Sequence, residues 1–105
     1  MAQSFDIDVS IEADELVVRA SGELDLSTRT ILVDRVIPSL KDGGAVRIAI
    51  VLDEVTFCDS SGLGALLDLR RAAGDAGIDL VLRNVSPPVA RLLDLTDVDG
   101  WLARE

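Results

Sequence analysis

An almost continuous apolar run from Ala45 to Leu52 constrains the fold of this chain more than any other feature. It has the length and the β-branched content of a strand that is covered on both faces, as the strands of a parallel sheet are. The polar pair Asp53-Glu54 then predicts a turn or a bulge, and Val55 to Cys58 carries the chain onward. A helical pattern follows from about Leu63 to Ala76. The stretch between them therefore predicts a strand-to-helix turn that presents hydroxyl groups at a helix N-terminus.

The segment before this central strand predicts a hairpin and a helix. Phe5 to Ile11 alternates apolar and polar residues, and Leu16 to Ser21 reads as a second strand after a short polar link. Two such strands form an antiparallel pair at the edge of a sheet. The helix that follows has Asp25 or Ser27 as its candidate N-cap and apolar residues at helical spacing up to Leu40.

The segment after Ala76 predicts a further strand and a further helix. Ile78 to Arg83 is apolar enough for a strand, and Ser86 is placed to cap a helix that has Pro87 at its first position. A short segment through Val98, Trp101 and Leu102 is expected to pack back on the body. The order β-β-α-β-α-β-α predicts an α/β fold with a mixed sheet of four or five strands and packed helices, in one domain over residues 1–105.

Composition excludes several classes of function. The net charge of −9 argues against nucleic acids and anionic membranes as partners, because both require basic patches. No apolar run reaches ~18 residues and the N-terminus has no basic and apolar leader, so we expect a cytoplasmic protein without a membrane span. One cysteine and no histidine leave no usual zinc site, and we predict no metal and no cofactor. Cys58 is expected to be a buried small hydrophobe rather than a reactive thiol.

The chain lacks the parts of a typical nucleophilic enzyme. A serine nucleophile needs a base within hydrogen-bond reach, but there is no histidine, and the single lysine, Lys41, is far away in the sequence. Asp25 and Asp59 are a possible acid and base, yet no pattern indicates a substrate pocket or a phosphate-binding loop. We therefore predict no enzymatic activity and no catalytic residue.

The helix after the turn has two apolar sides. At about 100° per residue, one arc should face the sheet, and it holds Gly62, Ala65, Leu66, Leu69, Ala72, Ala73 and Ala76. Leu63 and Leu67 fall off this arc, beside Arg70. Either another helix covers these two leucines, or they are anchors of a partner-binding face that Gly64 lets a partner approach closely.

The two serines of the turn have two candidate roles. Ser60 or Ser61 can cap the helix by accepting backbone N–H groups of its first turn. A serine beside Asp59 on an exposed turn is also well placed as a phosphorylation substrate. Phosphate adds roughly two negative charges, which a partner docked on an apolar and acidic surface would oppose. One serine for each role satisfies both interpretations.

Four stretches, in order, resemble the STAS family and in particular the bacterial anti-sigma factor antagonists, also called anti-anti-sigma factors. They are Gly22-Glu23-Leu24-Asp25, Val55-Thr56-Phe57, Asp59-Ser60-Ser61-Gly62-Leu63-Gly64, and Val85-Ser86-Pro87-Pro88-Val89-Ala90-Arg91-Leu92-Leu93. The resemblance spans nearly the whole chain and implies a STAS-like fold. It also implies that the unmodified protein binds an anti-sigma factor that is a serine kinase, which frees a sigma factor for transcription.

The resemblance assigns roles to individual residues. Ser60 is implied as the phosphoacceptor, with Ser61 as the runner-up acceptor and the favoured helix cap, and a PP2C-type phosphatase is implied as the enzyme that resets the switch. Asp25 matches the acidic loop beside the phosphosite. The implied partner-binding residues are Glu23, Asp25, Asp59, Ser61, Gly62, Leu63, Gly64 and Leu67.

Two other classes of function compete with this one. The first is a STAS-fold scaffold subunit of a transporter or signalling complex without a sigma-factor circuit, and the intact acceptor serine disfavours it. The second is a small nucleotide- or phosphate-binding enzyme, which the missing histidine and phosphate loop disfavour.

Overall fold

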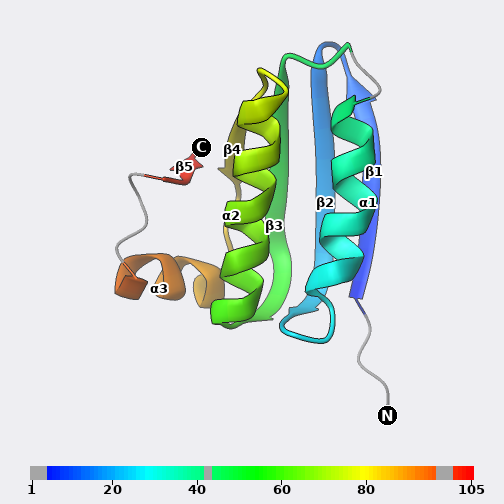
Figure 1. Ribbon diagram of the computed structural model, residues 1–105. Coiled ribbons are helices and arrows are strands. Elements are labelled where there is room, and N and C mark those ends of the chain that lie inside the picture. The colour runs from blue at the N-terminus through cyan, green and yellow to red at the C-terminus, as the bar shows by residue number, and fades with distance from the viewer. Residues whose placement is uncertain (1–4, 42–43, 97–100) are drawn as a thin grey trace.

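The fold is a five-stranded mixed sheet with α1 and α2 packed side by side on one face (Figure 1). A computed structural model describes residues 5–41, 44–96 and 101–105. The strands are β1 (Phe5–Glu12), β2 (Glu15–Leu24), β3 (Arg47–Cys58), β4 (Asp79–Arg83) and β5 (Ala103–Arg104). The helices are α1 (Arg29–Lys41), α2 (Ser60–Asp75) and α3 (Pro87–Thr96). The predicted α/β order is confirmed, with β5 as an additional last strand.

The strand predicted to be central is the middle strand of the sheet. The strand order is β1-β2-β3-β4-β5, in which β1 pairs antiparallel with β2 and every other pair is parallel. Parallel strands need a long crossover connection, and helices provide it here. Because β2 and β3 run in the same direction, the turns that follow them lie at the same end of the sheet, which is the lower end in Figure 1.

The Asp53-Glu54 pair bends β3 but does not end it. The strand runs on to Cys58, and its register against β2 shifts between Arg19 and Ser21 and again between Gly22 and Glu23. Of the two predicted alternatives, a turn or a bulge, the structure contains the bulge. An extra residue on one strand locally increases bending and twist. The irregular end of β3 delivers the chain to the start of α2.

The main core lies between the sheet and its helices. Ile48 and Ile50 of β3 and Leu66 of α2 are fully buried within it, and Leu32, Val36 and Leu40 are the buried residues of α1. An ion pair between Arg29 and Asp68 joins the two helices at 2.8 Å.

The end of the chain packs back as predicted, but only in part. Leu102 is 1% exposed and belongs to the core, whereas Trp101 is 61% exposed. The guanidinium carbon of Arg70 lies over the Trp101 ring, 5.4 Å from the ring centroid. The third residue of this prediction, Val98, lies outside the described residues.

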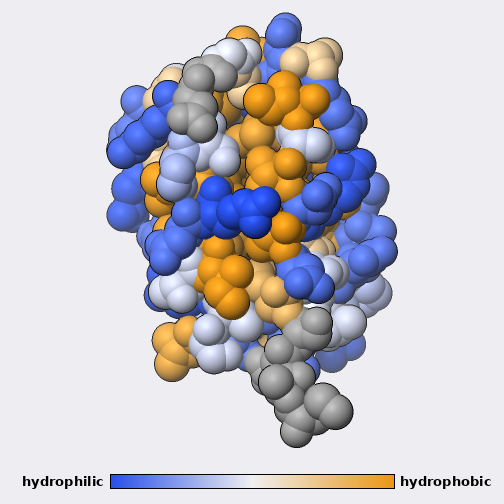
Figure 2. All heavy atoms as spheres, turned by 90° about the vertical axis from the view of Figure 1, so that its right-hand side faces the viewer, coloured by the Kyte–Doolittle hydropathy of each residue, from blue (hydrophilic) through white to orange (hydrophobic). Residues whose placement is uncertain are grey.

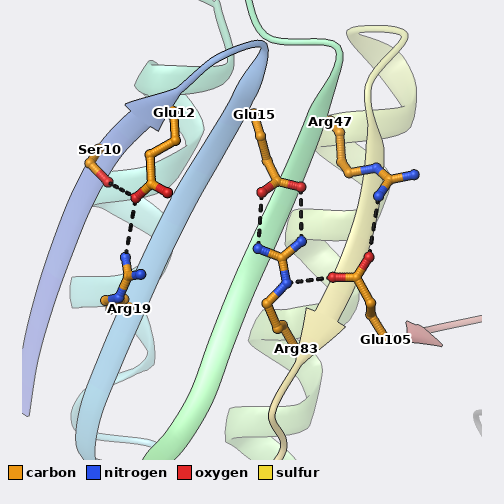
Figure 3. A network of polar contacts seen from close by, with 7 residues as sticks. All are labelled: Ser10, Glu12, Glu15, Arg19, Arg47, Arg83 and Glu105. Atoms are coloured by element: carbon orange, nitrogen blue, oxygen red, sulfur yellow. Dashed lines mark hydrogen bonds and ion pairs between the residues drawn. The ribbon is translucent and has the colours of Figure 1, made fainter.

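The opposite face of the sheet carries ion pairs instead of a helix (Figure 3). Arg83 of β4 donates two hydrogen bonds of 2.9 Å to the Glu15 carboxylate of β2 and a further one to Glu105, which also pairs with Arg47 at 3.3 Å. The hydrogen bond from Arg83 lowers the pKa of Glu15. A bidentate arginine fixes geometry as well as charge. This network therefore ties β2, β4 and the C-terminal residue together.

The β1 side of the molecule exposes apolar surface between charged side chains (Figure 2). Phe5, Ile7 and Val9 pack partly against the core, while Ile11 is 62% exposed and Ile31 of α1 is 47% exposed. β1 is the edge of the sheet farthest from β5 in the strand order. This side is thus well separated from α3, which follows β4.

The predicted start of α3 is confirmed in position but not in the contact of its hydroxyl. Ser86 directly precedes Pro87, the first residue of α3, and its carbonyl accepts from the Ala90 N–H at 2.9 Å. Its hydroxyl is buried and donates a 2.6 Å hydrogen bond to the Val55 carbonyl of β3, and it accepts from no backbone N–H among the described residues. A buried hydroxyl takes the nearest strong acceptor, and the bulged strand supplies one.

Candidate functional site

The ends of β2 and β3 bring two of the sequence motifs together. Glu23 is paired with Phe57 and Leu24 with Cys58, and the Asp59 N–H donates to the Leu24 carbonyl at 3.3 Å. The acidic turn after β2 is therefore the direct neighbour of the serine turn after β3. The family resemblance implied that these motifs lie near each other, and parallel pairing of adjacent strands is the physical cause.

Asp59 is the N-cap of α2, and the expectation that a serine caps this helix is wrong. Asp59 has extended backbone angles, and its Oδ1 accepts from the Gly62 N–H at 2.9 Å. Its carbonyl accepts from the Leu63 N–H at 2.9 Å. Aspartate caps as well as serine does, and here it comes first in the chain. The helix consequently starts at Ser60, about three residues earlier than predicted.

Gly62 is required by close packing of α2 against β2. A Cβ atom at this position would lie 2.4 Å from the Leu24 carbonyl oxygen and 2.9 Å from the Cys58 Sγ. Gly64 differs, since a Cβ there would meet nothing within 4 Å. The space over Gly64, which was predicted to let a partner approach, is open. Gly62 instead allows α2 to pack closely against β2.

The two serines are left with unoccupied hydroxyls. Ser60 is exposed and Ser61 is half-buried, in the first turn of α2. Neither hydroxyl makes a hydrogen bond within the part of the chain that the structure describes. Because Asp59 caps the helix, no structural role uses either hydroxyl. The Ser60 hydroxyl is the more accessible of the two.

The acidic turn before α1 is held by its own aspartate. The Asp25 Oδ1 accepts from the Ser27 N–H at 3.0 Å, the Ser27 hydroxyl at 2.8 Å and the Thr28 N–H at 3.2 Å. The hydrogen bond from the Ser27 hydroxyl is the largest cause of a lowered pKa for Asp25, and burial opposes it. Of the two predicted caps, Asp25 fills the role. The turn is fixed, and it holds a negative charge beside β3.

Leu63 is buried, which contradicts its predicted place on an exposed face. It is 6% exposed and belongs to the core that also contains Val89 and Leu93 of α3 and Leu102. Of the two alternatives that the sequence left open, coverage by a further element holds for Leu63, which shares its core cluster with residues of α3 and of the C-terminal segment. Leu67 is half-buried and packs partly against the same core. Neither leucine offers the freely exposed anchor that was expected.

Cys58 is a buried thiol, as predicted. It is 8% exposed, and burial together with the nearby Asp59 charge raises its pKa to about 11. A thiol with such a pKa is almost fully protonated at neutral pH and is a poor nucleophile.

Sequence reasoning missed an apolar groove beside the serine turn. The groove has a volume of about 330 Å³ and is lined by Phe57, Cys58, Pro87, Pro88, Arg91, Leu92 and Leu95. Phe57 is 46% exposed and Leu95 is 76% exposed. The pattern gave one signal for it, a large aromatic residue, Phe57, close before the serine turn. We refer to these seven residues as the α3 groove.

Comparisons with known proteins identify the family. A family model described as "Mlab, STAS domain" matches residues 7–104 of this chain. The chain therefore belongs to the STAS domain family, whose sheet and helices the structure reproduces. Within that family its relatives are anti-sigma factor antagonists, as the sequence resemblance indicated.

Two relatives and one solved protein illustrate this likeness. The anti-sigma F factor antagonist of Paenibacillus polymyxa is 35% identical over 81 residues, covering 77% of this chain and 69% of that protein. The anti-sigma-B factor antagonist of Bacillus subtilis is 29% identical over 93 residues, covering 89% and 84%. The structure of the anti-sigma factor antagonist SpoIIAA in its unphosphorylated form matches with a TM-score of 0.77 at 22% identity, covering 97% and 88%. SpoIIAA from Bacillus in the phosphorylated form matches with a TM-score of 0.71, again at 22% identity, over 97% and 91%.

Within residues 5–41, 44–96 and 101–105, none of the helices is long and apolar enough to cross a bilayer.

Proposed function

We propose that this protein is an anti-sigma factor antagonist that is switched by phosphorylation of Ser60. In its unmodified form it binds a cytoplasmic anti-sigma factor that is also a serine kinase, and so releases a sigma factor. It acts by binding and not by catalysis. The observation that carries the proposal is the exposed Ser60 hydroxyl, which makes no hydrogen bond within the described residues and directly follows the Asp59 cap.

Local electrostatics supports a switch at this position. A phosphoserine carries about −1.5 to −2 charges at neutral pH. The N-terminus of α2 would partly stabilise that charge. Asp59 is adjacent, and the turn that bears Asp25 lies at the end of the neighbouring strand. Added negative charge on this acidic surface would repel a partner that fits the unmodified form. A penalty of ~3 kcal/mol already lowers affinity more than a hundredfold.

The names of the relatives support the circuit. Both curated relatives are antagonists of anti-sigma factors, and SpoIIAA has been solved with and without phosphate. We therefore propose the anti-sigma factor kinase as the partner that modifies Ser60, and a PP2C-type phosphatase as the enzyme that removes the phosphate. Glu23, Asp25, Asp59, Ser61 and Gly64 would form the surface around the switch.

The test uses the serine-kinase anti-sigma factors encoded in the same genome. Each is incubated with the protein, ATP and Mg²⁺, and intact mass and phosphopeptide mapping follow the product. We expect phosphate on Ser60, no mass shift in Ser60→Ala, and full modification of the matched variant Ser61→Ala. Unmodified Ser60→Ala should bind like the wild type, because an exposed hydroxyl leaves no buried group unpaired. Ser60→Asp should bind at least tenfold more weakly.

Two outcomes would contradict this proposal. Phosphate on Ser61 with Ser60→Ala still fully modified would exchange the roles of the two serines. Binding of none of the anti-sigma factors by the unmodified wild type would remove the antagonist function itself.

A further inference from the structure

The lining of the α3 groove includes two exposed apolar side chains. Phe57 at the end of β3 and Leu95 near the end of α3 both line it, and both are largely exposed. Exposed apolar residues that gather around one hollow mark interaction sites more often than scattered ones do. Its volume of about 330 Å³ is at the lower limit of what a small ligand needs and is suited to one or two large side chains.

The groove is continuous with the proposed switch surface. Phe57 is three residues before Ser60, so their Cα atoms are at most about 11 Å apart. Phe57 is also the register partner of Glu23, next to the acidic turn. A protein interface of ordinary size covers about 800 Å² on each partner, which corresponds to a radius of about 16 Å. A partner centred on Ser60 therefore reaches the Phe57 end of the groove.

The charge of Arg91 indicates which kind of partner segment the groove can bind. Arg91 is its only basic lining residue, it is exposed, and no carboxylate pairs with it among the residues that the structure describes. An apolar side chain next to an acidic residue would use both the hollow and this cation. A second copy of the chain is a poor occupant, since it would bring one net charge of −9 against another.

We propose that the α3 groove receives an apolar anchor residue of the anti-sigma factor, with an adjacent carboxylate of that partner paired to Arg91. This inference rests on the proposed function, and it adds a second contact area that is separate from the phosphorylated serine. The anchor supplies affinity from buried apolar contact, while Ser60 supplies control.

The first test is a matched pair of substitutions of exposed aliphatic residues. Leu95→Ser removes one wall of the groove, and Ile11→Ser removes a similarly exposed residue, 62% exposed, on β1 at the other edge of the sheet. Binding of each unmodified variant to the anti-sigma factor is measured by calorimetry. We expect at least a tenfold loss for Leu95→Ser and no change for Ile11→Ser. Equal thermal midpoints would show that both variants fold.

A second pair tests the charge. Arg91→Glu should weaken binding about tenfold and change its salt dependence, whereas Arg71→Glu on the outer surface of α2 should leave binding within twofold.

The outcomes separate this proposal from the function on which it rests. Wild-type binding by both Leu95→Ser and Arg91→Glu, together with weak binding by Ser60→Asp, would overturn the groove and keep the switch. A free protein that is dimeric, and that becomes monomeric only in Leu95→Ser, would identify a second copy as the occupant and also overturn it. Failure of the wild type to bind any anti-sigma factor would overturn both proposals.

Discussion

The two strand-to-helix turns of this protein use the same residue types in opposite ways. Each has an aspartate that accepts the backbone N–H groups of the following helical turn, Asp25 before α1 and Asp59 before α2. In the first turn the neighbouring hydroxyls are occupied, because Ser27 donates to Asp25 and Thr28 donates to the Glu23 carbonyl at 2.7 Å. In the second turn the hydroxyls of Ser60 and Ser61 make no hydrogen bond within the described residues.

The difference shows what makes a hydroxyl available for chemistry. Thr28 is buried at 6% exposure and holds the β2–α1 turn together, so modifying it would disrupt the fold. Ser60 is exposed, and its hydroxyl is not needed as a cap because the Asp59 carboxylate accepts from the Gly62 N–H. A hydroxyl at a helix start is therefore available for modification only when another residue already caps the helix.

The largest effect on stability should come from Gly62→Ala, which disrupts the close packing of α2 against β2. The new Cβ would lie 2.4 Å from the Leu24 carbonyl oxygen, a backbone atom that cannot rotate away. We expect a loss of about 3 kcal/mol in the free energy of unfolding, measured by urea denaturation.

Gly64→Ala is the matched control for this substitution. Nothing lies within 4 Å of its Cβ position, and replacing glycine by alanine inside a helix stabilises by about 0.5–1 kcal/mol. If both variants lost stability equally, the close approach of α2 to β2 would not be the cause.

An intermediate loss of stability is expected when a hydroxyl of the β2–α1 turn is removed, and almost none when a hydroxyl of the β3–α2 turn is removed. Thr28→Val removes the acceptor of the Asp25 N–H at 3.0 Å in a buried position and should cost about 1–3 kcal/mol. Ser60→Ala and Ser61→Ala should each change stability by less than about 0.5 kcal/mol. Chemical denaturation of the three variants measures this. A clear loss in Ser61→Ala would mean that Ser61, and not Asp59 alone, caps α2.

The smallest effect is the acid sensitivity of the β2–α1 turn. The pKa of Asp25 is lowered in the folded protein, so its stabilisation is complete above its unfolded pKa of about 3.9 and is lost as the pH falls through the folded value. Asp25→Asn should therefore be less stable than the wild type at neutral pH, with a difference that shrinks below about pH 4. A difference in urea midpoint that stays constant with pH would show that the charge of Asp25 is not involved.

The local sequence pattern predicted the helices and strands well, because the periodicity of apolar residues is a property of each segment by itself. The alternation in Phe5 to Ile11 and the apolar run in Ala45 to Leu52 correspond to β1 and β3, and the sheet-facing residues Leu66 and Leu69 are fully buried. The same method left two alternatives open for Leu63, because a helical wheel does not show which other elements pack on a helix, and its burial decides between them. It also assigned the cap to a serine, since Asp59, Ser60 and Ser61 are all good capping residues.

The sequence by itself determined the α/β order, the central strand and the strand-to-helix position of the serines. Periodicity along single segments suffices for these features, whereas the proximity of the serines to the acidic turn was implied only by the family resemblance. Only the tertiary structure decided that Asp59 caps α2, that Leu63 is buried and that Phe57 and Leu95 flank a groove. These features depend on contacts between segments far apart in the chain, such as β2 against Gly62 and α3 beside β3. Such contacts leave no periodic signal in either segment alone.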